Sequence, residues 1–172
     1  NAASQITKPY VILISSDGFR YDYAEKYNAQ HLLKLRSSGV KAKSMIPSFP
    51  SVTYPNHYTV ATGLYPSHHG LVYNQFYDRS RQSSYNISDR KTVEDGTWYG
   101  GTPIWVLAEQ QAMLTASYFF VGDEAAIQQT YATYRYHFND TANVDFRINK
   151  VVEWLKLPED MRPHLICFYI SN

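Results

Sequence analysis

Short apolar runs that recur along the chain constrain its fold more than any other feature. Residues 9–17 (PYVILISSD) and 164–170 (HLICFYI) are almost continuously apolar, which is typical of strands buried on both faces of a parallel sheet. Residues 114–122 (LTASYFFVG) predict a further strand, and the alternating residues 40–46 (VKAKSMI) predict another. Parallel strands need long crossover connections, so we expect helices between them.

Helical patterns occupy these connections. Helices are expected at residues 29–39, 54–63, 102–111 and 144–155. Pro55 and Gly63 should mark the ends of the second helix, and Thr102 and Pro103 should be the cap and first residue of the third. The polar segment 78–97 is expected to be a surface excursion. The alternation predicts an α/β fold with a mainly parallel sheet sandwiched by helices.

The composition argues against several classes of partner. There are 16 Lys and Arg residues against 15 Asp and Glu, and the net charge of +1 gives no reason to expect a nucleic-acid polymer or an anionic membrane. No apolar run approaches the length of a membrane span. The 16 tyrosines suit a periplasmic or secreted (extracellular) protein. The single cysteine, Cys167, lies in an apolar run, so we expect a core residue and no disulfide framework.

The two ends of the chain carry predictions about domain organisation. Residues 1–8 are small and polar, and we expect a disordered stub left by signal-peptide removal or by cloning. Residues 9–172 are expected to form the N-terminal part of a catalytic domain. No covering helix follows the strand expected at 164–170, so the sheet should be incomplete at its C-terminal side. The remainder of that domain is then an expected partner.

Two polar residues stand where chemistry is expected. Thr53 lies in the run SFPSVTYPNHYT, at the expected start of a helix. It is either an ordinary N-cap or a positioned nucleophile, and a helix N-terminus also favours a bound phosphate. A threonine hydroxyl needs a base or a metal ion to become nucleophilic. Asp17, at the carboxyl end of the first strand, is a plausible metal ligand, or it merely begins a turn with Gly18.

Taken together, these segments resemble a known family. VILISSDGFR (11–20) and IPSFPSVTYPNHYTVATGLYPSHHGLVYNQFYD (46–78) resemble the nucleotide pyrophosphatase/phosphodiesterase family of the alkaline phosphatase superfamily. GGTPIWVLAEQQ, YFFVGDE and VDFRINKVVEWLKLPEDMRPHLICFYI follow in the family's order, so the resemblance extends over nearly the whole chain from Pro9. It implies an alkaline-phosphatase-like fold and hydrolysis of phosphodiester or pyrophosphate bonds in small, nucleotide-like substrates.

The resemblance also implies roles for five residues and for two Zn²⁺ ions. Asp17 matches the family's first metal-ligating aspartate. Thr53 matches the nucleophile, which also ligates that metal and forms a covalent ester with phosphorus. Asn74 matches an asparagine whose amide, with the Tyr54 backbone N–H, stabilises a phosphoryl oxygen. The Tyr54 ring matches a base-stacking position, and Phe138 is the candidate for the opposite ring, although plain packing is the commoner role of such side chains.

Other features depart from the family pattern. Phe120-Val121-Gly122 stands where relatives often have Trp-Pro-Gly, and Gly100 stands where several have lysine, which leaves the nucleobase preference open. The remaining metal ligands would lie beyond residue 172, so this chain should hold at most a partial zinc site and should be inactive alone. His57 and the pair His68-His69 are expected to be hydrogen-bonded scaffold.

Three functions remain to be compared. The first is a zinc-dependent phosphodiesterase with a threonine intermediate. The second is a phosphomonoesterase or phosphonate hydrolase of the same superfamily; a sulfatase is not expected, because Thr53 is neither the Cys nor the Ser that sulfatases modify. The third is a non-catalytic fragment that only binds phosphate or nucleotide. Rates on monoesters and diesters separate the first two, and tight zinc binding by this chain alone would argue against the third.

Overall fold

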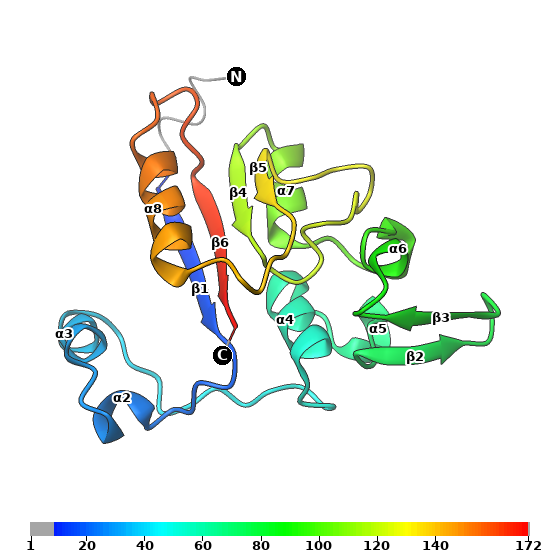
Figure 1. The fold of residues 1–172 in the computed structure, drawn as a ribbon, viewed down its shortest axis with the longest axis horizontal. Coiled ribbons are helices and arrows are strands. Elements are labelled where there is room, and N and C mark those ends of the chain that lie inside the picture. Colours follow the sequence, from blue (N-terminus) through cyan, green and yellow to red (C-terminus); the bar gives the residue numbers. More distant parts are fainter. Residues whose placement is uncertain (1–8, 172) are drawn as a thin grey trace.

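A computed structural model describes residues 9–171. The stub predicted at residues 1–8 lies outside this range. Within the range, parallel strands form a sheet in the order β1-β6-β4-β5 (Figure 1). Their bounds are β1 Val11–Ser16, β4 Thr115–Tyr118, β5 Tyr134–Tyr136 and β6 Leu165–Ile170. The predicted parallel sheet is therefore confirmed, and so are its strands at both ends of the described chain.

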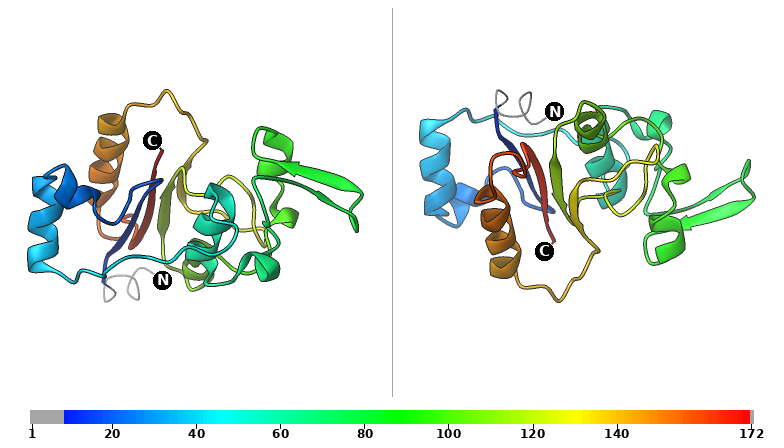
Figure 2. Two further views of the ribbon diagram at one scale, coloured as in Figure 1. Left: turned by 90° about the horizontal axis from the view of Figure 1, so that it is seen from below. Right: turned by 90° about the horizontal axis from the view of Figure 1, so that it is seen from above.

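Helices cover both faces of this sheet. Figure 2 shows α8 on one side, and α4 with α7 on the other. Trp154 of α8 and Trp105 of α7 are buried in the core against the sheet. The helices are α2 Tyr23–Lys26, α3 Gln30–Ser38, α4 Thr53–Thr62, α5 Pro66–His69, α6 Arg90–Val93, the 3-10 helix η1 Gly96–Trp98, α7 Ile104–Gln110 and α8 Val144–Leu155. This arrangement confirms the sandwich expected from the sequence.

The polar segment 78–97 is more regular than predicted. Strands β2 (Gln75–Asp78) and β3 (Ser83–Asn86) form an antiparallel hairpin beside α6 and η1. Tyr85 of β3 and Trp98, which directly follows the segment, are buried in the main core. Most of the segment is exposed, as predicted, but the buried Tyr85 of β3 anchors the hairpin to the core.

Two strand predictions need correction. Residues 40–46 form no strand; Val40 is 100% exposed, and no neighbouring strand in the described chain offers this segment a hydrogen-bonded partner. Strand β1 is not buried on both faces, since Ile14 is 61% exposed. The reason is its place in the sheet: over residues 9–171, β1 pairs with β6 alone and forms an edge.

The helix boundaries also differ slightly from the predictions. Helix α4 begins at Thr53, two residues before Pro55, and ends before Gly63, whose φ of 70° suits glycine. Helix α7 begins at Ile104, with Pro103 rather than Thr102 at the N-cap position. Among residues 9–171, no helix is long and apolar enough to cross a bilayer.

Candidate active site

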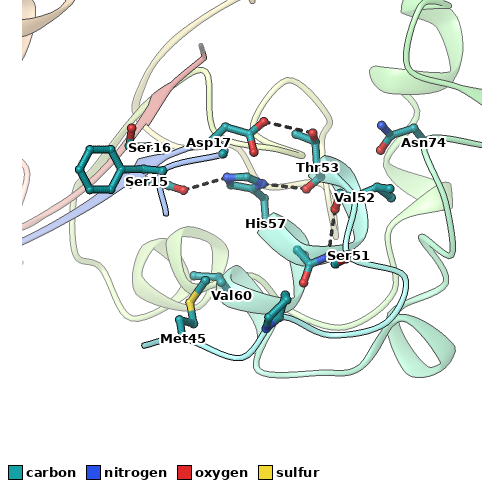
Figure 3. A pocket seen from close by; sticks show the side chains of 14 residues that line it. Ser15, Ser16, Asp17, Met45, Ser51, Val52, Thr53, His57, Val60 and Asn74 are labelled. Carbon is teal, nitrogen blue, oxygen red and sulfur yellow. Dashed lines mark hydrogen bonds between the residues drawn. The ribbon is translucent and has the colours of Figure 1, made fainter. Parts of the chain in front are cut away.

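Asp17 and Thr53 meet at the carboxyl edge of the parallel sheet. Asp17 follows β1, and its N–H donates to the carbonyl of Ile170 at the end of β6 over 2.9 Å. Gly18, with φ of 67°, turns the chain away immediately afterwards. Thr53 is the first residue of α4, and its Oγ1 donates to Asp17 Oδ2 over 3.1 Å (Figure 3). The two residues are thus in direct contact although 36 positions separate them.

The Thr53 hydroxyl does not act as an ordinary helix cap. The N-cap position belongs to Val52, and no side-chain hydrogen bond caps α4. The Asp17-Gly18 turn does form, with the Phe19 N–H 3.3 Å from the carbonyl of Ser16. That turn uses backbone groups, which leaves the Asp17 carboxylate directed at Thr53. The geometry therefore favours a chemical role for Thr53 over that of an ordinary N-cap, and a chemical role for Asp17 over that of a mere turn residue.

A cavity of about 450 Å³ opens beside this pair. Asp17, Thr53 and Asn74 all line it, together with His57 and Ser15 (Figure 3). Its remaining lining residues are Ser16, Gly18, Phe19, Met45, Pro47, Ser51, Val52, Asn56 and Val60. A hollow of this size at the carboxyl edge of an α/β sheet is the usual place for a small ligand.

Asn74 lies directly before β2, and its side chain contacts the start of α4. Its Oδ1 accepts a hydrogen bond from the Tyr54 N–H over 3.0 Å. The two groups expected to stabilise a phosphoryl oxygen are therefore adjacent, but here they bind each other. To face one substrate oxygen together, they would have to separate. Figure 3 shows the Asn74 side chain on the Thr53 side of the cavity.

The two aromatic candidates lie away from this cavity. The Tyr54 ring is tilted against Tyr85 of the hairpin, with centroids 6.2 Å apart, and its burial raises the pKa of the phenol well above the ordinary value. Phe138 is 44% exposed and contacts Phe119 at 5.2 Å between centroids. Neither lines the hollow that contains Asp17, and the structure records no ring contact between the two.

The sequence reasoning missed Tyr169. Its hydroxyl donates to Asp17 Oδ2 over 2.8 Å, so this one oxygen receives hydrogen bonds from both Tyr169 and Thr53. Burial, followed by this bond to Asp17, raises the pKa of the Tyr169 phenol. The only signal in the sequence was an aromatic residue near the end of a predicted strand. Its role depends on the register in which Tyr169 of β6 pairs with Ser15 of β1.

The histidines expected to be scaffold are hydrogen-bonded or exposed. His57 contacts Ser15 and the Thr53 carbonyl. His69 is fully buried between the Thr59 hydroxyl and the Leu71 N–H, and its burial lowers its pKa to about 4. His68 is exposed.

The positions that depart from the family pattern lie outside the cavity. Gly100 borders a separate hollow near His69, where a Cβ would lie 2.9 Å from the His69 carbonyl oxygen. A lysine there would therefore need a backbone shift in this chain. Phe120 is buried behind His57, with ring centroids 5.8 Å apart.

The oxygens of Asp17 and Thr53 suit a cation such as zinc in chemical type. They amount to two donors, and zinc sites in proteins have three or four protein ligands. Among residues 9–171, no group of three or more His, Cys, Asp or Glu side chains is placed to hold a metal ion. The described residues therefore fit one part of a zinc site.

Sequence comparisons find phosphodiesterases and pyrophosphatases that are similar to this chain. Venom phosphodiesterase 2 of Crotalus adamanteus is 38% identical over 164 residues, which are 94% of this chain and 20% of the venom protein. An uncharacterised pyrophosphatase/phosphodiesterase of Schizosaccharomyces pombe is 38% identical over 173 residues, 100% of this chain and 36% of its own length. Human ectonucleotide pyrophosphatase/phosphodiesterase family member 1 is 34% identical over 166 residues, 95% of this chain and 18% of the human protein.

Solved structures and a family profile complete the comparison. Murine ectonucleotide pyrophosphatase/phosphodiesterase 5 superposes with a TM-score of 0.89 at 27% identity, over 95% of this chain and 43% of the murine chain. The chain thus spans about a fifth of the length of the venom and human relatives. The profile of the type I phosphodiesterase/nucleotide pyrophosphatase family matches residues 11–172. The chain belongs to the type I phosphodiesterase/nucleotide pyrophosphatase family.

Proposed function

We propose that the protein hydrolyses phosphodiester or pyrophosphate bonds in nucleotide-like substrates, with Thr53 as the nucleophile. The observation that carries this proposal is the 3.1 Å contact between Thr53 Oγ1 and Asp17 Oδ2 beside an open cavity. Family membership supports phosphodiester chemistry. One structural neighbour, murine ectonucleotide pyrophosphatase/phosphodiesterase 5, was also solved as an inactive threonine-to-alanine form in complex with AMP, at 26% identity.

The reaction has two steps. In the first, Thr53 Oγ forms a bond to phosphorus, loses its proton to solvent, and the bond from phosphorus to the leaving oxygen breaks. In the second, a water oxygen bonds to phosphorus and the bond to Thr53 Oγ breaks, which returns the hydroxyl. The start of α4 places Thr53 where the positive end of the helix dipole favours the negative phosphate.

We further propose that Asp17 and Thr53 are two ligands in a site for two Zn²⁺ ions. Zinc, when bound, would polarise the phosphoryl oxygens and lower the pKa of a hydroxyl or water. Asp17 would anchor such a cation near Thr53, and the Tyr169 hydroxyl, which donates to the carboxylate, orients it. The other ligands of such a site would have to come from outside residues 9–171.

Substrate binding is assigned to Asn74, Tyr54 and Phe138. Asn74 would leave the Tyr54 N–H when substrate enters, so that amide and N–H both donate to one phosphoryl oxygen. Tyr54 and Phe138 would contact the nucleobase. The ectoenzymes and venom enzymes among the relatives support an extracellular location.

The test uses the full-length protein. We expect turnover of p-nitrophenyl thymidine monophosphate, much slower turnover of p-nitrophenyl phosphate, loss of activity with a zinc chelator, and recovery when zinc is restored. Thr53→Ala should abolish turnover, whereas Thr62→Ala, which removes a hydroxyl from the other end of the same helix, should not. Undiminished activity of Thr53→Ala would refute the role of Thr53. A preference for the monoester would favour a phosphomonoesterase, and failure to bind zinc would favour a non-catalytic protein.

A further inference from the structure

His57 forms a bridge between the strand that carries Asp17 and the residue that carries the nucleophile. Its Nε2 lies 2.8 Å from the hydroxyl of Ser15, two residues before Asp17 in β1. Its Nδ1 lies 2.7 Å from the backbone carbonyl of Thr53, one turn earlier in α4. The side chain is 7% exposed, so these two contacts take place largely out of water.

The partners of His57 determine which ring nitrogen carries the proton. A backbone carbonyl can only accept, so Nδ1 must donate to Thr53. In the neutral ring, Nε2 is then the acceptor, and the Ser15 hydroxyl donates to it. Both ring nitrogens are therefore satisfied in one tautomer, and the bridge runs from the Ser15 hydroxyl through the ring to the Thr53 carbonyl.

Aromatic rings hold the imidazole in this orientation. The ring of Tyr169 meets it edge to face, with centroids 5.0 Å apart, and Phe120 does so at 5.8 Å. Tyr169 is the same residue whose hydroxyl contacts Asp17. The packing that orients His57 is thus continuous with the hydrogen bonds around the Asp17 carboxylate.

The bridge differs in one chemical respect from the direct contact between Asp17 and Thr53. The direct contact uses the hydroxyl proton of Thr53, which must leave when that oxygen attacks phosphorus. The bridge uses the backbone carbonyl of Thr53 and does not depend on this proton. It can therefore hold the first turn of α4 against the end of β1 throughout the reaction.

We propose that His57 is a positioning residue, which keeps the Thr53 hydroxyl aligned at the end of β1 by linking the Thr53 carbonyl to Ser15. This inference rests on the proposed role of Thr53 as the nucleophile. It assigns His57 no proton transfer and no contact with substrate. Misalignment of the attacking oxygen lowers the rate of the chemical step more than it lowers ground-state binding.

Three variants of the full-length protein test this proposal with p-nitrophenyl thymidine monophosphate. His57→Phe keeps a planar ring but removes both hydrogen bonds, and it should lower kcat about 10- to 100-fold with KM changed less than about threefold. His57→Asn retains a donor near the position of Nδ1 but no longer reaches Ser15, so it should lower kcat less than His57→Phe does. Ser15→Ala removes one end of the bridge and should have an intermediate effect. Thr62→Ala again serves as the control.

A spectroscopic measurement gives a second test that does not depend on activity. Nitrogen-15 NMR of histidine-labelled protein should show a proton on Nδ1 of His57, the signal being assigned by its absence in His57→Asn. A proton on Nε2 with none on Nδ1 would overturn the proposal. If His57→Phe fails to fold, the kcat values of Ser15→Ala and His57→Asn are compared with that of the unmodified protein, and this comparison tests the positioning role.

The outcomes separate this inference from the proposed function. Full activity in Thr53→Ala would refute the nucleophile and the positioning role with it. An inactive Thr53→Ala together with an unchanged kcat in His57→Phe would overturn only the role of His57. Equal losses in kcat for His57→Phe and His57→Asn would also overturn it, since the donor to the Thr53 carbonyl would then not matter.

Discussion

The buried carboxyl group of Asp123 should make the protein less stable as the pH rises through the neutral range. Asp123 is 1% exposed, and its Oδ2 accepts hydrogen bonds from the Ser117 hydroxyl over 2.6 Å and the Phe120 N–H over 3.1 Å. Burial raises its pKa to about 8, compared with an ordinary value of 3.8. Between these values the folded protein keeps a proton on Asp123 that the unfolded chain releases.

This difference sets the sign and size of the effect. Because only the folded state binds the proton, the free energy of unfolding falls with rising pH by up to roughly 1.4 kcal/mol per pH unit. From pH 5 to pH 7 the loss from this one group is roughly 3 kcal/mol. The contribution is complete below the unfolded pKa and is lost as the pH rises through the folded pKa of about 8.

Chemical unfolding of the protein at a series of pH values measures this loss. Asp123→Asn keeps the shape and one acceptor oxygen but cannot ionise, so its free energy of unfolding should decline less steeply with pH than that of the unmodified protein. Glu159→Gln, which removes an exposed carboxylate, is the control. Equal pH dependence in the unmodified protein and in Asp123→Asn would refute the argument from burial.

Three further predictions concern other parts of the structure. Tyr169→Phe should lower zinc affinity about 10- to 100-fold, because it removes a donor to Asp17; chelator competition measures this, and unchanged affinity would contradict it. Gly96→Ala should destabilise the protein by about 1–3 kcal/mol, seen as a lower Tm, because the new Cβ would collide with the Ala126 carbonyl. Burial lowers the pKa of His69 to about 4, so between pH 6.5 and 4 the unfolded chain takes up a proton on this residue that the folded protein does not. Acidification over this range should therefore reduce the stability of the protein, and His69→Gln should remove this part of the acid sensitivity.

The parts of the fold that the sequence predicts well are those with a strong local signal. Helix α8 spans the predicted residues 144–155 because its apolar residues recur at helical spacing and the Asn143 side chain caps its first turn. Strand β6 was predicted from its continuous apolar run, and its residues from Leu165 to Tyr169 are buried. In both elements the local pattern and the tertiary packing agree.

The parts that were missed depend on contacts between distant segments. Strand β5 has only three residues, Tyr134–Tyr136, and exists because it pairs with β4. Residues 40–46 show the opposite error, since their alternating pattern finds no partner strand in the described chain. Hydrogen bonding between strands is not encoded in the composition of either strand alone.

The candidate site shows the same division. The sequence pattern and the family resemblance brought Asp17 and Thr53 together correctly, because a strand end and a helix start are both visible in the sequence. The contact of Tyr169 with Asp17 required the register between β1 and β6. The pairing of the Tyr54 N–H with Asn74 required the position of the hairpin. These contacts follow from tertiary structure rather than from local sequence.

The most direct measurement is to trap the covalent intermediate. The full-length protein is mixed with substrate, quenched in acid within a single turnover, digested and analysed by mass spectrometry. The account predicts a phosphoester on Thr53 and on no other residue, and none in Thr53→Ala. A phosphoester on a different residue, or continued turnover by Thr53→Ala, would contradict it.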